Sequence, residues 1–314
     1  VCFVHVSLVP VMGPVGEQKT KPTQHTVKEL RGLGIIPDIL VCRSEKPLEE
    51  ETRAKLAAFC HVGKDAVVSA HDVSNLYQIP ISLYEQSVLN KVSNHLGFEV
   101  PDSLPMLDDW KEMADKIDHL EEEVNIAMVG KYTGLSDSYL SVIKALQHSS
   151  FTVNRKLVID WIESTDLDPH DVTEKHDEAW ELLRAADGIL VPGGFGNRGV
   201  EGKIAAANYA RVNNVPYLGV CLGLQIATIE FCRNVLGLEN ANSTEFDENT
   251  PNPAVVFMPE ISKTHMGGTM RLGTKPTPFL VDDCKMRRLY GGADHVDERH
   301  RHRYEVNPDL IEQI

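Results

Sequence analysis

The sequence lacks the features that mark disulfide-rich, zinc-binding and membrane-spanning proteins. Its six cysteines, at positions 2, 42, 60, 221, 232 and 284, form no C-x-x-C pair in a chain of 314 residues. This pattern favours reduced thiols and a cytoplasmic protein. The first charge-free stretch has only 16 residues, is interrupted by Pro10, Gly13 and Pro14, and has no basic segment before it. These properties argue against a membrane span and against a signal peptide.

A surplus of positive charge is also missing. The chain has 31 Lys and Arg against 46 Asp and Glu, a formal charge of −15. Nucleic-acid polymers and anionic membranes require clustered basic residues, so we expect no nucleic-acid and no membrane partner. A phosphate-binding P-loop, G-x-x-x-x-G-K-[ST], is absent from the sequence, and we find no internal repeat. The length predicts about two domains, and the apolar fraction of 42% predicts globular ones.

The first part of the chain alternates between apolar and amphipathic segments. Short Val- and Ile-rich runs predict strands, and apolar spacing of three and four predicts helices. We expect strands at 1–9, 36–43 and 66–73 and helices at 25–34 and 48–60. This alternation is typical of an α/β layer with a parallel sheet.

A Pro-containing stretch with a charged helix pattern, 101–122, predicts a linker and a connecting helix. After it, strands are expected at 124–132, 156–164, 187–196 and 216–223. Helices are expected at 136–150, capped by Ser136 or Asp137, and at 177–188, 201–214 and 224–237. The pattern is that of a doubly wound α/β domain. Beyond residue 240 the sequence is irregular and β-like.

The segment GVCLG, 219–223, places Cys221 between a predicted strand and a predicted helix. Its G-x-C-x-G spacing is the thiol counterpart of the G-x-S-x-G nucleophile elbow. The helix N-terminus would favour the thiolate, and the Leu222 N–H would face a developing oxyanion. The alternative is a buried structural cysteine on a strand.

The glycine loop PGGFGNRG follows the preceding strand. Gly194, Gly196 and Gly199 match G-x-G-x-x-G, but no acidic residue follows at the distance that dinucleotide binding requires. We expect the N–H groups of Gly194 and Phe195 to complete an oxyanion hole. A purely structural turn remains the alternative.

The sequence does not identify an acid–base partner for Cys221. Like charges disfavour a protonated histidine inside an arginine cluster, so the basic run near the end suits a substrate carboxylate better than proton transfer. The downstream candidates are His265, His295, His300 and His302, three of them beside Arg299, Arg301 and Arg303.

The segment EQKTKPTQ places two lysines in what we predict to be an extended loop after the first strand. Lys19 and Lys21 would share one face, stiffened by Pro22, and Thr20, Thr23 and Gln24 would add hydrogen-bonding groups. Lysines at the carboxyl end of a strand suit phosphate binding. Two merely solvated lysines are the alternative.

Taken together, these segments resemble the CTP synthase family over nearly the whole chain. The segments are GEQKTKPTQHTVKELRGLG, VGKYTGLSDSYLSVIKAL, PGGFGNRGVEGK, PYLGVCLGLQ, ANSTEF, MGGTMRLG and RHRHRYEVNP. The resemblance implies the C-terminal part of a P-loop synthetase-like parallel-sheet domain at 1–100. A linker and connecting helix at 101–122 and a class I glutamine amidotransferase domain of flavodoxin-like α/β fold at 123–314 would follow.

The family makes CTP from UTP with ATP and with ammonia released from glutamine. By resemblance, Cys221 is the glutaminase nucleophile, and glutamine contacts fall on Gly194, Leu222, Gly223, Leu224, Gln225, Glu245 and Arg303. The UTP and CTP site falls on Lys19, Thr20, Lys21, Pro22, Thr23, Gln24 and Lys55. His71, Asp72 and Val73 match a stretch beside ATP, and 198–202 lies in the loop associated with activation by GTP.

The resemblance also implies Mg²⁺, a homotetramer and possible filaments. The P-loop, the magnesium-binding carboxylates and the terminal His–Glu element of the family have no match in this sequence. We therefore expect an internal fragment that by itself makes no CTP and hydrolyses glutamine negligibly. A non-catalytic truncated paralogue that assembles with full-length subunits is the alternative, and a stand-alone thiol hydrolase is a third interpretation.

Overall fold

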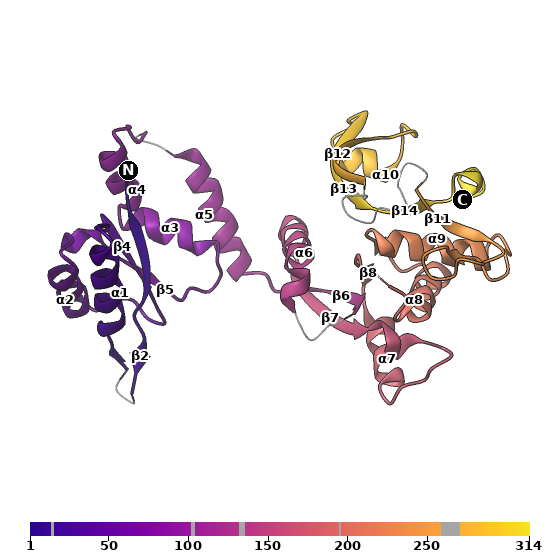
Figure 1. Ribbon diagram of the computed structural model, residues 1–314, viewed down its shortest axis with the longest axis horizontal. Helices are drawn as coiled ribbons and strands as arrows, with labels where there is room; N and C mark the ends of the chain where they lie inside the picture. The colour runs from indigo at the N-terminus through magenta and orange to yellow at the C-terminus, as the bar shows by residue number, and fades with distance from the viewer. Residues whose placement is uncertain (14–15, 102–103, 132–135, 195, 259–270) are drawn as a thin grey trace. The chain divides into compact units, whose positions relative to one another are not determined.

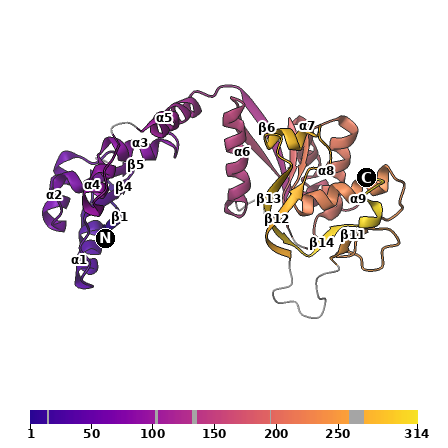
Figure 2. The same cartoon turned by 90° about the horizontal axis from the view of Figure 1, so that it is seen from above.

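The computed structural model describes residues 1–13, 16–101, 104–131, 136–194, 196–258 and 271–314, without the side chains of 136–137 and 271–272. The chain divides into two compact units, Val1–Glu121 and Glu122–Ile314. Each is described by itself (Figures 1 and 2). The domain limits expected from the sequence stay predictions. Among the described residues, no helix has both the length and the apolar character needed to cross a membrane.

Unit 1 is built on a parallel sheet of three strands. The strands are β1 (Val4–Leu8), β4 (Ile39–Ser44) and β5 (Val67–His71), in the order β1-β4-β5. Side chains alternate between the two faces of a strand, and β4 has apolar residues on both faces. Leu40 and Cys42 pack with α1 (Lys21–Gly32) and α2 (Glu50–Cys60). Ile39 and Val41 pack with α3 (Gln78–Glu85) and α4 (Val88–Leu96).

Short elements complete unit 1. A small antiparallel ribbon pairs β2 (Val11–Met12) with β3 (Glu17–Gln18) just before α1. The single-turn helix η1 (Lys64–Ala66) leads into β5, and α5 (Pro105–Asp118) follows α4.

The start of α1 corrects the sequence-based prediction of an extended lysine loop. The helix begins at Lys21 rather than after Gln24, with Pro22 in its first turn. Proline suits that position, because its fixed φ is helical and its missing N–H would have no partner there. Glu17 and Gln18 form β3, so only Lys19 and Thr20 remain between that strand and the helix. Helices α3 and α4, which follow β5, were not predicted from the sequence.

Unit 2 contains a parallel sheet of four strands with connecting helices. The strands are β6 (Glu123–Gly130), β7 (Lys156–Glu163), β8 (Gly188–Val191) and β9 (Tyr217–Gly219), in the order β7-β6-β8-β9. Numbered along the chain this order is 2-1-3-4, as in flavodoxin-like folds. The helices are α6 (Leu140–Thr152), α7 (His176–Ala185), α8 (Val200–Asn213) and α9 (Leu222–Asn234).

Two helix limits in unit 2 differ from the prediction. The one-turn helix η2 (Ser136–Tyr139) precedes α6, so α6 begins at Leu140. The Tyr139 hydroxyl donates to the Lys131 carbonyl at 2.6 Å and ties this turn to the end of β6. Helix α7 ends at Ala185, and Gly188 is the first residue of β8 instead of a helix stop.

The part of unit 2 after α9 is mostly β structure. Strand β11 (Pro253–Phe257) lies between β10 (Asn242–Ser243) and β14 (Tyr304–Val306), while β12 (Arg271–Pro278) pairs with β13 (His295–His302). Three single-turn helices complete the unit: η3 (Ser164–Leu167), α10 (Lys285–Leu289) and η4 (Pro308–Leu310). Tyr304 packs against the core cluster that holds Ile226 and Ile229 of α9. This packing brings the basic run beside the start of α9.

Candidate functional site

Cys221 lies at a sharp turn between β9 and α9. Its backbone angles are φ 55° and ψ −105°, a conformation that non-glycine residues rarely adopt. The Val220 N–H donates to the Val191 carbonyl of β8 at 3.0 Å, and the Gln225 N–H donates to the Cys221 carbonyl at 3.2 Å. The turn is therefore held by β8 on one side and by the first turn of α9 on the other.

The two glycines of the G-x-C-x-G segment are required by close backbone contact. A Cβ on Gly219 would lie 2.3 Å from the Gly223 carbonyl carbon, and a Cβ on Gly223 would lie 2.0 Å from the Val191 carbonyl oxygen. Real Cβ atoms do not approach backbone atoms so closely. The spacing seen in the sequence thus allows β9 and the start of α9 to pack directly on each other and on β8.

Burial raises the pKa of the Cys221 thiol above its ordinary value, and the Glu245 carboxylate raises it further. The Leu222 N–H acts in the opposite direction and lowers this pKa by hydrogen bonding to the sulfur. Burial outweighs that contribution. The helix N-terminus thus acts on the Cys221 pKa in the expected direction, but burial has the larger effect in this pocket.

A pocket of about 240 Å³ opens beside Cys221. It contains one carboxylate, from Glu245, and the guanidinium of Arg303, whose buried Nε has no hydrogen-bond partner among the described residues. The Gln225 side chain donates to the Tyr304 carbonyl at 3.3 Å. Beside the thiol, the Glu245 carboxylate can pair with the ammonium group of a free amino acid, and the Arg303 guanidinium can pair with its carboxylate.

The structure brings together five of the residues expected at the glutamine site. Gly194, Cys221, Gln225, Glu245 and Arg303 all line this pocket.

Three other expected residues lie in the first turn of α9 but do not line the pocket. The Leu222 side chain is buried in the core, Gly223 packs against β8, and the Leu224 side chain is 56% exposed. Phe195 and His265 lie outside the described residues. Their contribution to the site stays a prediction.

Three more residues of the basic run line the pocket. Arg301 and the candidate partner His302 lie at the end of β13, and Tyr304, which was not expected there, begins β14, which pairs with β11. The run RHRHRYEV is visible in the sequence, but its pairing with β11 is not. His295 and His300 lie in β13 and are not among the lining residues.

A second pocket of about 240 Å³ lies on the other side of Gly194, where β6 and β8 end. It is lined by Gly130, Lys131, Tyr139, Pro192, Gly193, Gly194 and Lys203. Burial and the nearby Lys131 lower the pKa of Lys203 to about 8. Beside it, Arg198 forms an ion pair with Glu163 at 3.3 Å. The segment 198–202 therefore borders a pocket that contains two lysines.

In unit 1, the lysine segment lies at the carboxyl end of β1. Lys19 pairs with Glu17 at 2.7 Å, and Lys55 of α2 is close enough to lower the pKa of Glu17 as well, although Lys19 has the larger effect. Lys21 lies over the Phe59 ring at 6.0 Å. Lys19 of the segment and Lys55 of α2 therefore both act on Glu17, and Lys21 contacts the aromatic ring of Phe59 in α2.

The hydroxyl and amide groups of the segment hold its backbone. Thr23 is fully buried and donates to the Leu8 carbonyl at 3.1 Å, and Gln24 donates to the Thr20 hydroxyl at 2.9 Å. These contacts give Thr20, Thr23 and Gln24 a structural part that the sequence did not reveal.

The stretch expected beside ATP follows directly from β5. His71 is the last residue of the strand, and Asp72 forms an ion pair with Arg43 of β4. Val73 comes next and is half-buried. Because the strands are parallel, this stretch and the lysine segment lie at the same edge of the sheet.

The resemblance implies Mg²⁺, which proteins usually bind through one or two carboxylates together with waters and substrate phosphates. Within the described ranges, no group of three or more His, Cys, Asp or Glu side chains is placed to hold a metal ion.

Comparison with known proteins gives two family matches. Residues 1–98 match the CTP synthase N-terminus, and residues 135–314 match the class-I glutamine amidotransferases. A CTP synthase from Dictyostelium discoideum is 53% identical over 332 residues, which cover 100% of this chain and 58% of that protein. CTP synthase 1 from Homo sapiens is 53% identical over 311 residues, which cover 98% of this chain and 53% of that protein.

A solved structure, the glutaminase domain of Trypanosoma brucei CTPS with bound acivicin, is also similar. It is 43% identical in sequence with a TM-score of 0.55, and the match covers 60% of this chain and 70% of that one. The second family match spans more than half of the chain, so the chain belongs to the class I glutamine amidotransferases. Its curated relatives place it, within that class, in the CTP synthase family. The predicted family and fold class are confirmed, and the chain spans about half the length of the curated relatives it matches.

Proposed function

We propose that this chain is part of a CTP synthase in which unit 2 attacks glutamine at Cys221 and supplies ammonia for the ATP-dependent amination of UTP to CTP, whereas the chain by itself hydrolyses glutamine negligibly. The observation that carries this proposal is the pocket in which a thiol at a positive-φ elbow faces Glu245 and Arg303. In this pocket the substrate carboxylate pairs with Arg303 and its ammonium pairs with Glu245. The side-chain amide of glutamine then reaches Cys221.

The first step forms a thioester and releases ammonia. The Cys221 sulfur bonds to the amide carbon, and the C–N bond of the amide breaks. The proton lost by the thiol balances the one gained by the leaving nitrogen, and water then cleaves the thioester to give glutamate. The Leu222 N–H at the start of α9 and the backbone at Gly194 stabilise the negative oxygen that forms transiently during each of these two steps.

Unit 1 carries, in this proposal, part of the nucleotide site. The lysine segment 19–24 with Lys55 binds the phosphates of UTP, or of CTP as feedback inhibitor, and 71–73 lies beside ATP. GTP acts as activator through 198–202. The assembled enzyme is a homotetramer, with filaments as a further possible assembly. The lysines around Glu17 and the shared sheet edge support this assignment.

Covalent labelling with acivicin tests the glutaminase proposal. We expect one adduct per chain, located at Cys221 by peptide mass spectrometry, and protection by L-glutamine. The Cys221→Ser variant should not be labelled, whereas Cys232→Ser, which alters a fully buried cysteine in the same helix, should be labelled normally. Arg303→Met should label about tenfold or more slowly, because it loses a charge-assisted pair with the carboxylate.

Labelling that persists in Cys221→Ser, or that glutamine does not slow, contradicts the proposal. A folded chain that takes no label at all would instead favour the non-catalytic paralogue considered from the sequence. Ammonia release from glutamine, measured on the same samples, then shows whether the labelled site also turns over.

A further inference from the structure

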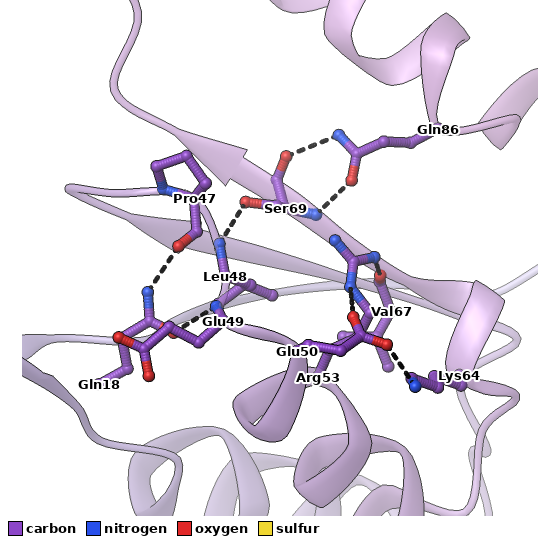
Figure 3. Close-up of polar contacts among 10 residues, drawn as sticks. All are labelled: Gln18, Pro47, Leu48, Glu49, Glu50, Arg53, Lys64, Val67, Ser69 and Gln86. Atoms are coloured by element: carbon purple, nitrogen blue, oxygen red, sulfur yellow. Dashed lines mark hydrogen bonds and ion pairs between the residues drawn. The ribbon is translucent and has the colours of Figure 1, made fainter.

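The Ser69 hydroxyl lies inside unit 1 between a backbone amide and a histidine. Ser69 is 4% exposed, and its Oγ accepts a hydrogen bond from the Leu48 N–H at 3.1 Å (Figure 3). The same Oγ lies 3.2 Å from Nδ1 of His71, two residues further along β5. The hydroxyl thus joins the turn after β4 to the last residue of β5.

Counting protons favours one direction for the second hydrogen bond. A backbone N–H can only donate, so Oγ is the acceptor toward Leu48. The hydroxyl still has one proton, and a buried proton without an acceptor is costly. His71 Nδ1 is the acceptor in place. A neutral imidazole that accepts at Nδ1 carries its own proton at Nε2.

The backbone of Ser69 is held on the outer edge of β5. Its N–H donates to Oε1 of Gln86 at 2.8 Å, and its carbonyl accepts from Nε2 of Gln86 at 2.9 Å (Figure 3). The side-chain amide takes the place of a neighbouring strand. Any movement of the Ser69 backbone relative to Gln86 would therefore break both bonds.

The same turn that meets Ser69 also anchors the lysine segment. The buried Gln18 amide donates to the Pro47 carbonyl at 2.8 Å and accepts from the Glu49 N–H at 3.0 Å (Figure 3). Gln18 immediately precedes Lys19. One turn, 47–49, therefore sets the position of both the lysine segment and Ser69.

We propose that Ser69 is a positioning residue that holds neutral His71 as the Nε2–H tautomer, so that the ring donates a hydrogen bond to an acceptor oxygen of a bound nucleotide. The ligand class is a nucleoside triphosphate, which is ATP in the proposed function, where 71–73 lies beside it. This ligand role rests on the proposed function of unit 1, whereas the tautomer does not.

Nitrogen NMR of the full chain, labelled with ¹⁵N-histidine at pH 8, reads the tautomer without any ligand. His71→Gln identifies the His71 signals among those of the 13 histidines. We expect an unprotonated Nδ1 and a protonated Nε2. Ser69→Ala should shift both signals toward the average of the two tautomers, and Ser69→Thr, which keeps the hydroxyl, should restore them. Ser93→Ala removes another buried serine hydroxyl of unit 1, bonded to the Asn90 carbonyl, and should change nothing.

A protonated Nδ1 in the unmodified chain overturns the proposal even if Ser69→Ala does not fold. Unchanged His71 signals in a folded Ser69→Ala variant overturn it as well. Calorimetric titration with ATP and with UTP tests the ligand role. Loss of one hydrogen bond predicts about threefold to tenfold weaker ATP binding in Ser69→Ala.

Two further outcomes separate this inference from the proposed function. ATP that binds equally well to Ser69→Ala and to the unmodified chain overturns the role of His71, while the nucleotide site stands. A chain with the expected tautomer that binds neither nucleotide contradicts the nucleotide role of unit 1 and confirms the assignment of the Ser69–His71 bond.

Discussion

Both units place their reactive groups where parallel strands end, but they fix these groups by different means. In unit 1, side chains hold the loops: Gln18 and Ser69 bond to the turn after β4. In unit 2, backbone packs directly on backbone, because Gly219 and Gly223 leave no room for a Cβ. The elbow at Cys221 additionally stores strain in its positive φ. A site made of side-chain hydrogen bonds should lose stability gradually on substitution, whereas a site made of backbone contact should fail at once.

The Gly223→Ala variant tests the backbone-packed site and should give the largest effect. Its Cβ would meet the Val191 carbonyl oxygen at 2.0 Å, so backbone has to move. We expect the free energy of unfolding to fall by about 3 kcal/mol or more, at the upper end of overpacking effects, with loss of acivicin labelling. Gly32→Ala, at an open position at the end of α1, should change it by about 1 kcal/mol at most. Urea unfolding measures the free energy of unfolding of both variants. Equal losses would show that the backbone contact at Gly223 does not make this site intolerant of substitution.

Lys203 predicts a pH effect confined to unit 2. Its pKa is about 8 in the folded chain against an ordinary 10.5, so the unfolded chain binds more protons between these values. The stability contributed by this group therefore rises with pH from about 8 to 10.5. Lys203→Met should be more stable than the unmodified chain by about 2 to 3 kcal/mol at pH 7. The difference should shrink as the pH approaches 10.5, and a constant difference across that range would contradict the burial of a charged amine.

Gln18→Ala tests the two hydrogen bonds by which the Gln18 side chain holds the turn 47–49 of unit 1. It leaves the Pro47 carbonyl and the Glu49 N–H without their partner, which should lower the free energy of unfolding by about 1 to 2 kcal/mol. Gln78→Ala is the control, because that amide contacts exposed aspartates and should cost about 0.5 kcal/mol or less. Chemical denaturation distinguishes the two. A loss as large as that of Gly223→Ala would show that a site held by side-chain hydrogen bonds tolerates substitution no better than a site held by backbone packing.

Lys19→Met should have the smallest effect on stability. Lys19 and Glu17 form an exposed ion pair, and such pairs contribute little. We expect the midpoint of thermal unfolding to stay nearly unchanged while UTP affinity falls at least tenfold, because a phosphate contact is lost. A variant with a clear loss of stability but normal UTP binding would assign Lys19 to the fold instead of the ligand.

The sequence predicted those features that depend on neighbouring residues. The elbow at Cys221 follows from glycine spacing within five residues, and most strands follow from short apolar runs. The prediction of an extended loop at Lys21 is wrong. Proline is common in loops but also suits the first turn of a helix, so Pro22 alone does not distinguish the two conformations.

Features that depend on distant contacts were not predictable. Tyr304 lines the pocket at the start of β14, which pairs with the distant strand β11. Tertiary packing buries the Cys221 thiol and raises its pKa, whereas the local helix terminus lowers it. The hydrogen bonds of the Gln18 side chain join residues about thirty positions apart, and no local sequence pattern indicates them.

A crystal structure of the chain after reaction with acivicin would show how the pocket in unit 2 holds an amino acid. We expect the label bonded to Sγ of Cys221, its carboxylate paired with Arg303 and its ammonium with Glu245. The backbone from Gly219 to Gly223 should stay as it is without the label. An adduct at Cys221 whose carboxylate lies away from Arg303, or an elbow that unwinds to admit the label, would contradict the assignment of this pocket to glutamine.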